Sequence, residues 1–220
     1  MITLDPVVLV LGDEGDWSAA EVGRELDARG VRWQLLDTID FPQRMRMDAR
    51  LDSTGGWRGE FVTDNGATLR LDEVTAVYYR KPRDFDLPAG LSGPERRFSH
   101  AQARVGLGGV LASLPARWIS HPAALADAEY KPRQLELLRR AGLAPPPTLI
   151  TNSATAVREF AAAHGDLAVK PLAEPIVWED GGESAVYTRR ISADDLDDST
   201  ASTPRHTSSS SFKRSAMNVV

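Results

Sequence analysis

Near the N-terminus, apolar residues form short runs that are separated by one helical stretch. The run VVLVLG, residues 7–12, is typical of a strand that is covered on both faces. Ser18 and Glu21 form a capping-box pattern, and Gly30 supplies a helix stop after the following amphipathic turns. The segment VRWQLLD then predicts a second strand. Residues 7–37 therefore read as one β-α-β unit with a parallel crossover.

Beyond this unit the pattern changes from long apolar runs to strict alternation. The segments MRMDARLD, GWRGEFVTD and ATLRLDE alternate apolar with polar residues, and Gly55-Gly56 and Asn65-Gly66 punctuate them as hairpin turns. TAVYYRKP predicts another buried strand, residues 95–114 a helix, and RWIS a return to the sheet. We expect a first domain of class α/β over residues 1–118.

The second region repeats the alternation of helix and strand at smaller scale. Pro132 after Lys131 suits a first helical position, and Gly142 ends that helix. APPPTLIT and LAVK predict strands, and a hairpin follows around Asp180-Gly181-Gly182. We expect a second domain over residues 119–197.

The composition of the chain changes at residue 198. ISADDLDD opens like a capped helix, but the Ser/Thr-rich sequence after it has no apolar period. Such a composition cannot bury enough surface to offset the entropy of ordering. We expect residues 198–220 to be a disordered tail that follows a reading-frame change or a premature end.

Composition narrows the class of protein. A chain of 220 residues buries roughly 70% of its unfolded surface, and no apolar stretch approaches the roughly 20 residues of a membrane span. The N-terminus lacks a secretory signal, so we expect a cytoplasmic protein that does not bind membranes. The chain has no cysteine, and its four histidines show no metal-ligand spacing. A net charge of −5 disfavours nucleic acid as a partner. Small molecules or peptides are the expected binding partners.

Two lysines carry the candidate chemistry. Lys131 stands where a helix begins, and the free N–H groups there make another cation unfavourable unless an anion binds. Lys170 ends a buried strand, the place where ligands gather in open α/β sheets. The glycine turn, Gly181 and Gly182, could fold over the same place to complete a phosphate cradle. A strand-end lysine is more often simply solvated, so this alternative stays open.

A second basic group stands at the end of the strand predicted from TAVYYRKP. Arg80, Lys81 and Arg83 could receive an acidic peptide, because arginine forms charge-assisted pairs with carboxylates. Exposed loop charges also occur without any role.

Several motifs carry a resemblance to a known family. WISHPAALADAEYKPRQLELLRRAGLAPPPTLITN resembles the junction in ATP-grasp ligases where a lysine opens a helix, a glycine ends it and a P-x-T-L-I-T strand follows, and the lysine of LAVKPL matches their second lysine. VVLVLGDEGD, VYYRKP, WISHP and VWEDGGESAVYTRR are similar to ATP-grasp ribosomal peptide maturases, the graspetide or microviridin-type macrocyclases, more than to the related RimK-type ligases. The resemblance covers residues 7–197.

The resemblance implies a pre-ATP-grasp α/β domain followed by the N-terminal subdomain of an ATP-grasp fold. The implied activity is ATP-dependent ligation: a side-chain carboxyl of a ribosomal precursor peptide is activated as an acyl phosphate, and a hydroxyl or amine then closes a ring. Lys131 and Lys170 would contact the phosphates, and Gly181 and Gly182 would form the turn of a hairpin that closes over the nucleotide. No catalytic residue is assigned, because this chemistry needs no enzyme nucleophile, and homo-oligomerisation stays open.

The chain departs from the family pattern at two places. Residues 173–175 replace a glycine-rich run after the second lysine, and the C-terminal half of the fold, which holds Mg²⁺ in the family, is missing after residue 198. We therefore expect this chain to be inactive or nearly so and to contain no metal ligand. Two alternatives remain: a non-enzymatic remnant that binds a peptide or partner, and a RimK-like ligase that adds amino acids to a protein tail.

Overall fold

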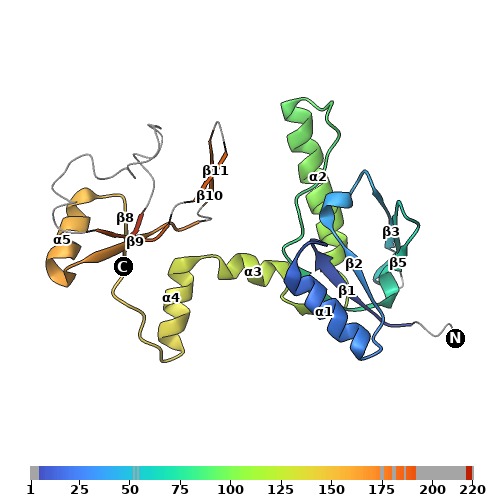
Figure 1. Cartoon of the computed structure of the whole chain (residues 1–220), viewed down its shortest axis with the longest axis horizontal. Helices are drawn as coiled ribbons and strands as arrows, with labels where there is room; N and C mark the ends of the chain where they lie inside the picture. The colour runs from blue at the N-terminus through green and yellow to red at the C-terminus, as the bar shows by residue number, and fades with distance from the viewer. Residues whose placement is uncertain are drawn as a thin grey trace. The chain divides into compact units, whose positions relative to one another are not determined.

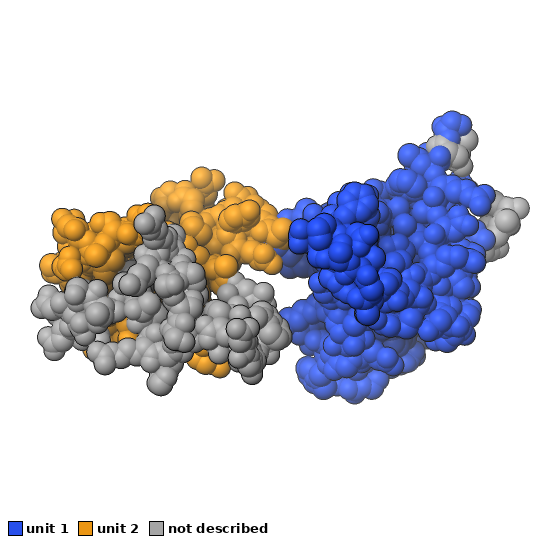
Figure 2. Space-filling view, turned by 90° about the horizontal axis from the view of Figure 1, so that it is seen from above, with its two compact units in different colours: residues 1–125 blue, residues 126–220 orange. Residues whose placement is uncertain are grey.

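The computed structural model describes residues 5–51, 53, 55–173, 176–179, 182–185, 187–191 and 217–219. The chain divides into two compact units, residues 1–125 and residues 126–220 (Figure 2). The sequence predicts the division at 118/119. In the part of the chain that the structure describes, no helix is long and apolar enough to cross a membrane.

Unit 1 is built on a four-stranded parallel sheet in the order β2-β1-β6-β7. Figure 1 labels its strands β1 and β2 beside helix α1. Its strands are β1 (Val7–Gly12), β2 (Trp33–Leu36), β6 (Val74–Arg80) and β7 (Arg117–Ile119). The parallel β1-α1-β2 unit that the sequence predicts is confirmed, with Val8 opposite Trp33. All four carboxyl ends therefore lie at one edge of the sheet.

Helix α1 (Trp17–Ala28) packs against β1 and β2. Its N-cap is Asp16, whose Oδ1 accepts a hydrogen bond from the Ala19 backbone N–H at 2.9 Å. The predicted capping box of Ser18 and Glu21 is wrong, because Asp16 occupies the cap position and Ser18 already lies inside the helix.

A three-stranded antiparallel sheet, in the order β3-β4-β5, follows β2 and confirms the predicted alternation. Its strands are β3 (Met45–Leu51), β4 (Trp57–Thr63) and β5 (Thr68–Arg70), and two short 3₁₀ helices flank it, η1 (Thr38–Asp40) and η2 (Leu71–Glu73). One face contributes Met45, Phe61 and Leu69 to the core. The other face carries charged residues.

Helix α2 (Gly93–Ala112) completes unit 1. Ser92 is its N-cap and forms a capping box with Glu95, so the helix begins slightly before the predicted residue 95. The main core joins α2 to both sheets. Its buried residues include Val7, Leu9, Leu11, Met45, Phe61, Leu69, Val77, Leu107, Val110 and Leu111.

Unit 2 carries the helices α4 (Lys131–Arg140) and α5 (Ala154–His164) and a four-stranded sheet in the order β12-β9-β13-β8. A short helix, α3 (Pro122–Ala128), precedes α4 and is not predicted from the sequence. The strands are β8 (Leu149–Thr151), β9 (Leu167–Lys170), β12 (Arg189–Ile191) and β13 (Met217–Val219). A small core around Val157 and Leu167 holds α5 against this sheet.

Two features of unit 2 relate directly to expectations from the sequence. The predicted hairpin is confirmed as β10 (Ile176–Glu179) paired antiparallel with β11 (Gly182–Ala185), with Glu179 opposite Gly182. Strand β13 lies within the predicted disordered tail and pairs with β8 and β9. Residues 198–216 and 220 lie outside the described residues.

Candidate functional site

The carboxyl edge of the parallel sheet in unit 1 gathers the loops that follow β1, β2 and β6. Gly12, the last residue of β1, lies opposite Arg80, the last residue of β6. A Cβ atom on Gly12 would lie 2.3 Å from the Arg80 carbonyl oxygen. Only glycine allows the two strand ends to approach this closely. The residues that follow Gly12 and Arg80 are thus brought together.

Arg80 pairs with the cap of helix α1. Its Nε lies 3.2 Å from Oδ1 of Asp16, the oxygen that also accepts the Ala19 N–H. The Ala19 N–H, and after it the Arg80 guanidinium, lower the pKa of Asp16 below its ordinary value. The carboxylate therefore links the start of α1 to the end of β6.

Arg83 pairs with a buried carboxylate that follows β2. Asp37 is 2% exposed and accepts two hydrogen bonds from Arg83, one from its backbone N–H at 2.8 Å and one from Nε at 2.6 Å. Asp13 lies 3.4 Å from the same Nε. The hydrogen bond with Asp37 raises the pKa of Arg83, so the guanidinium stays charged. Both arginines predicted to receive an acidic peptide are thus paired within unit 1, and peptide binding by them stays a prediction.

Lys81 differs from its two arginine neighbours. It is exposed, and among the described residues its side chain forms no hydrogen bond or ion pair. Its backbone φ is +44°, in the left-handed region that a side chain with a Cβ atom rarely adopts.

In unit 2, Lys131 contacts the segment that follows Lys170. Its Nζ donates a hydrogen bond to the Leu172 carbonyl oxygen at 2.6 Å. Lys131 is the first residue of α4, whose N-cap Tyr130 provides no side-chain cap. The Lys131 ammonium, at the end of a long side chain from the first turn of α4, is therefore in contact with the chain just after β9.

Lys170 is the last residue of β9 and is exposed. Among the described residues its side chain makes no hydrogen bond or ion pair, while its backbone is in register with Asn218 of β13. Gly182 begins β11 of the hairpin, whereas Gly181 lies outside the described residues. The structure thus brings Lys131 to the backbone that follows Lys170, and it does not test the predicted role of the glycine turn.

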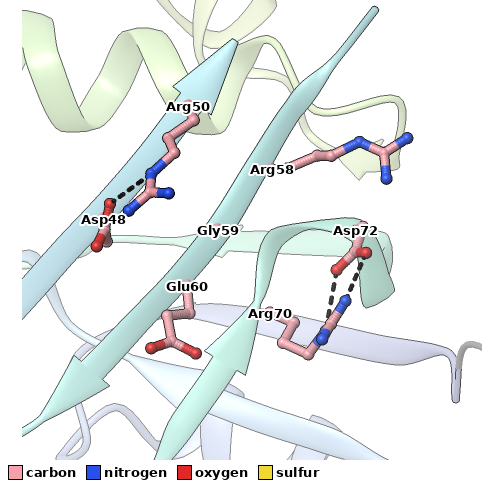
Figure 3. A pocket seen from close by; sticks show the side chains of 7 residues that line it. All are labelled: Asp48, Arg50, Arg58, Gly59, Glu60, Arg70 and Asp72. Carbon is pink, nitrogen blue, oxygen red and sulfur yellow. Dashed lines mark hydrogen bonds and ion pairs between the residues drawn. The ribbon is translucent and has the colours of Figure 1, made fainter. Parts of the chain in front are cut away.

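A charged hollow of about 370 Å³ lies on the outer face of the antiparallel sheet (Figure 3). Like charges oppose each other across β3 and β4: Asp48 pairs in register with Glu60, and Arg50 with Arg58. Opposite charges compensate them, since Arg50 lies 3.5 Å from Asp48 and Arg70 donates two hydrogen bonds to Asp72 (Figure 3). This face is internally neutralised, so we assign it no ligand.

A second hollow, of about 400 Å³, borders α4 and β8 in unit 2. Glu136 lines it and accepts hydrogen bonds from Arg139 and Arg140. Arg139 first, and then Arg140, lower the pKa of Glu136 from 4.5 to about 2. This carboxylate is a structural ion-pair partner in α4.

Sequence reasoning missed four participants of these sites: Asp13, Asp16, Asp37 and the Leu172 carbonyl. A carboxylate directly after each of two buried strands was the available signal for Asp13 and Asp37. Across the described residues, no group of three or more histidine, aspartate or glutamate side chains could hold a metal ion. We assign no metal ligand.

Residues 7–125 match the family of the MvdD pre-ATP grasp domain. No curated protein matches the chain.

Three solved structures resemble most of the chain. The macrocyclase MdnC from Microcystis aeruginosa MRC, bound with precursor peptide MdnA, is 26% identical with a TM-score of 0.80, over 97% of this chain and 67% of that chain. The ATP-grasp ligase PsnB, complexed with minimal precursor, Mg and ADP, is 25% identical with a TM-score of 0.68, over 96% of this chain and 64% of that chain.

The third is a RiPP-associated ATP-grasp ligase from Chryseobacterium gregarium in complex with ADP and a leader and core peptide. It is 20% identical with a TM-score of 0.83, over 97% of this chain and 62% of that chain, and this likeness shows the fold alone. The chain thus spans 62% to 67% of the length of these ligases.

Proposed function

The chain belongs to the family of the MvdD pre-ATP-grasp domain, and on that premise we propose that it is part of an ATP-dependent ligase that macrocyclises a ribosomal precursor peptide. The likeness to the macrocyclase MdnC, which was crystallised with its precursor peptide, supports this proposal over almost the whole chain.

The proposed reaction has two steps. A side-chain carboxylate oxygen of the peptide attacks the γ-phosphorus of ATP, the bond to the β-γ bridging oxygen breaks, and ADP leaves with the electron pair. A hydroxyl or amine of the same peptide then attacks the acyl carbon, phosphate leaves, and the nucleophile's proton passes to a base. The products are an ester or amide ring, ADP and phosphate. Positioning and charge neutralisation supply the catalysis, and no covalent enzyme intermediate is needed.

The observation that carries the nucleotide site is the hydrogen bond of Lys131 to the Leu172 carbonyl at 2.6 Å. It joins the uncapped first turn of α4 to the chain directly after Lys170. N–H groups at a helix start and nearby ammonium groups together favour a phosphate group. Lys131 and Lys170 would hold the phosphates of ATP, and the β10-β11 hairpin would cover them.

Magnesium is part of the PsnB complex, and we expect the ligase to use it. It would neutralise phosphate charge in the first step. Since no metal ligand is assigned among the described residues, the roles proposed for Lys131 and Lys170 are limited to holding and orienting the phosphates.

Calorimetric titration of the 220-residue chain with AMPPNP tests the proposal. We expect binding that Lys170→Ala weakens at least about tenfold, as loss of a charged phosphate contact predicts. Binding of a precursor peptide with no nucleotide binding at all would instead favour the non-enzymatic module. Release of phosphate from Mg-ATP tests the separate prediction that this polypeptide is inactive, and robust turnover would refute it.

A further inference from the structure

Lys81 is the one basic residue at the carboxyl edge of unit 1 that has no internal partner among the described residues. Arg80 is paired with Asp16, and Arg83 is paired with Asp37 and Asp13. Lys81 is exposed, so its ammonium is accessible from solvent.

The backbone of Lys81 is in an unfavourable conformation. Among the described residues it is the only one other than glycine with a positive φ, +44°. Glycine adopts this conformation without the steric cost that a Cβ atom brings. A lysine at such a position lowers stability relative to glycine, and strained residues of this kind cluster at ligand sites.

The residues on both sides hold Lys81 in place. Arg80 ends strand β6 in register with Gly12. Arg83 is fixed through its backbone N–H and its guanidinium to the buried Asp37, and the Thr38 hydroxyl donates to the Arg83 carbonyl oxygen. Strained conformations persist where neighbouring structure imposes them, and here it does so from both sides.

Lys81 also lies at the point where the order of the sheet reverses. The chain passes from β1 to β2 on one side of β1, and β6 and β7 lie on the other side. Lys81 directly follows β6, and the loop of residues 13–16 directly follows β1. Ligands of open parallel sheets bind in the crevice outside the carboxyl ends of such a strand pair.

We propose that Lys81 is a specificity-determining residue whose ammonium binds a side-chain carboxylate of the peptide at the carboxyl edge of unit 1. The inference rests on the proposed function, which makes the ligand an acidic peptide. The local charge argues against a phosphate chain: three carboxylates already lie beside the two arginines, so with Lys81 the cluster has no net positive charge to hold a polyanion, and its one exposed ammonium can donate to a single carboxylate. A carboxylate accepts charge-assisted hydrogen bonds from an ammonium group.

The test measures binding and stability in the same variants of the 220-residue chain. The probe is a short fluorescein-labelled peptide of glutamate, threonine and glycine with an amidated C-terminus, and its counterpart has glutamine in place of glutamate. Lys81→Gly removes the ammonium and relieves the backbone, and Lys81→Arg keeps the charge. Arg104→Gln removes an exposed charge from α2 as the matched control.

We expect wild type to bind the glutamate peptide more tightly than the glutamine peptide. Lys81→Gly should weaken binding of the glutamate peptide about tenfold and leave the glutamine peptide unchanged, while the Tm rises by about 2 °C. Lys81→Arg should retain most of the preference, and Arg104→Gln all of it.

Equal binding of the two peptides by wild type, or an unchanged preference in Lys81→Gly, would overturn the proposal. A fall in Tm of Lys81→Gly would contradict the strain on which it stands. The peptide-binding result can be distinguished from the test of the ligase proposal, because the AMPPNP titration measures nucleotide binding at Lys131 and Lys170. If the chain prefers the glutamate peptide but does not bind AMPPNP, the result supports the role proposed for Lys81 and counts against the ligase proposal.

Discussion

The Lys131 ammonium donates a hydrogen bond to the backbone carbonyl of Leu172, which lies 41 residues away in the sequence, at 2.6 Å. The contact links the start of α4 to the chain just after β9. It also ties Leu172, two residues after Lys170, to α4. The arrangement of the proposed phosphate site thus depends on one of the two lysines that would bind the phosphates.

Lys131→Met removes this hydrogen bond and leaves the apolar stem of the side chain. We expect amide hydrogen exchange over residues 168–173 to become faster, because the segment loses its tether to α4. Arg133→Gln is the control, since Arg133 lies in the same helix and pairs with Asp127 instead. Unchanged exchange in Lys131→Met would show that the contact does not order the segment.

Asp37→Asn should destabilise unit 1 by about 2 kcal/mol, because an amide NH₂ group would replace an acceptor for the buried hydrogen bonds from Arg83. Asp13→Asn is the matched control: Asp13 contacts the same Nε at 3.4 Å but is more exposed, so its effect should be much smaller. Urea denaturation of both variants measures the difference. Equal effects would mean that Asp37 is no more important than a surface ion pair.

Gly12→Ala should lower the free energy of unfolding by about 2 kcal/mol or more. The alanine Cβ would lie 2.3 Å from the Arg80 carbonyl oxygen, so the backbone of β1 or β6 would have to shift. Gly106→Ala in helix α2 is the opposite case. Its Cβ would meet no atom within 4 Å, and alanine favours a helix interior by about 1 kcal/mol over glycine. The denaturation midpoint should therefore fall in Gly12→Ala and rise in Gly106→Ala. Midpoints that change in the same direction would contradict the close approach of β1 and β6.

Glu136 should titrate with a pKa of about 2, below its ordinary 4.5. Because the pKa is lowered in the folded state, the stabilisation is fully present above pH 4.5 and is lost as the pH falls from 4.5 to about 2. NMR titration of the side-chain carboxyl measures the midpoint. Arg139→Gln should raise this midpoint, since Arg139 is the largest cause of the shift. A midpoint near 4.5 in wild type would contradict the paired geometry.

Much of the fold follows from local patterns in the sequence. The β1 run, the alternating strands of the antiparallel sheet and the β10-β11 hairpin are confirmed because their signals lie within a few residues. The α/β class and the resemblance to ATP-grasp peptide maturases are confirmed by the family match and by the similar structures. The cap of α1 was predicted wrongly, since Asp16 and Ser18 are both good capping residues and only the preceding loop decides between them.

The partners within the sites could not be predicted in the same way. Asp37 after β2 looks like a solvated carboxylate, and its burial depends on Arg83, 46 residues later. Arg80 looks free until Asp16, 64 residues earlier, is placed beside it. Pairings over such separations are set by the register of the sheet. The positive φ of Lys81 likewise has no signal in the identity of the residue.

A double-mutant cycle on nucleotide affinity tests the central claim, that Lys131 and Lys170 bind the phosphates of the same nucleotide. AMPPNP binding is measured by calorimetry for wild type, Lys131→Met, Lys170→Met and the double variant, with Arg158→Gln in α5 as an exposed control. Each single substitution should raise the Kd at least about tenfold, and the double variant should lose less than the product of the two factors, because both side chains contact the same ligand. Strictly multiplicative losses, or a single variant that binds AMPPNP as wild type does, would contradict the shared site.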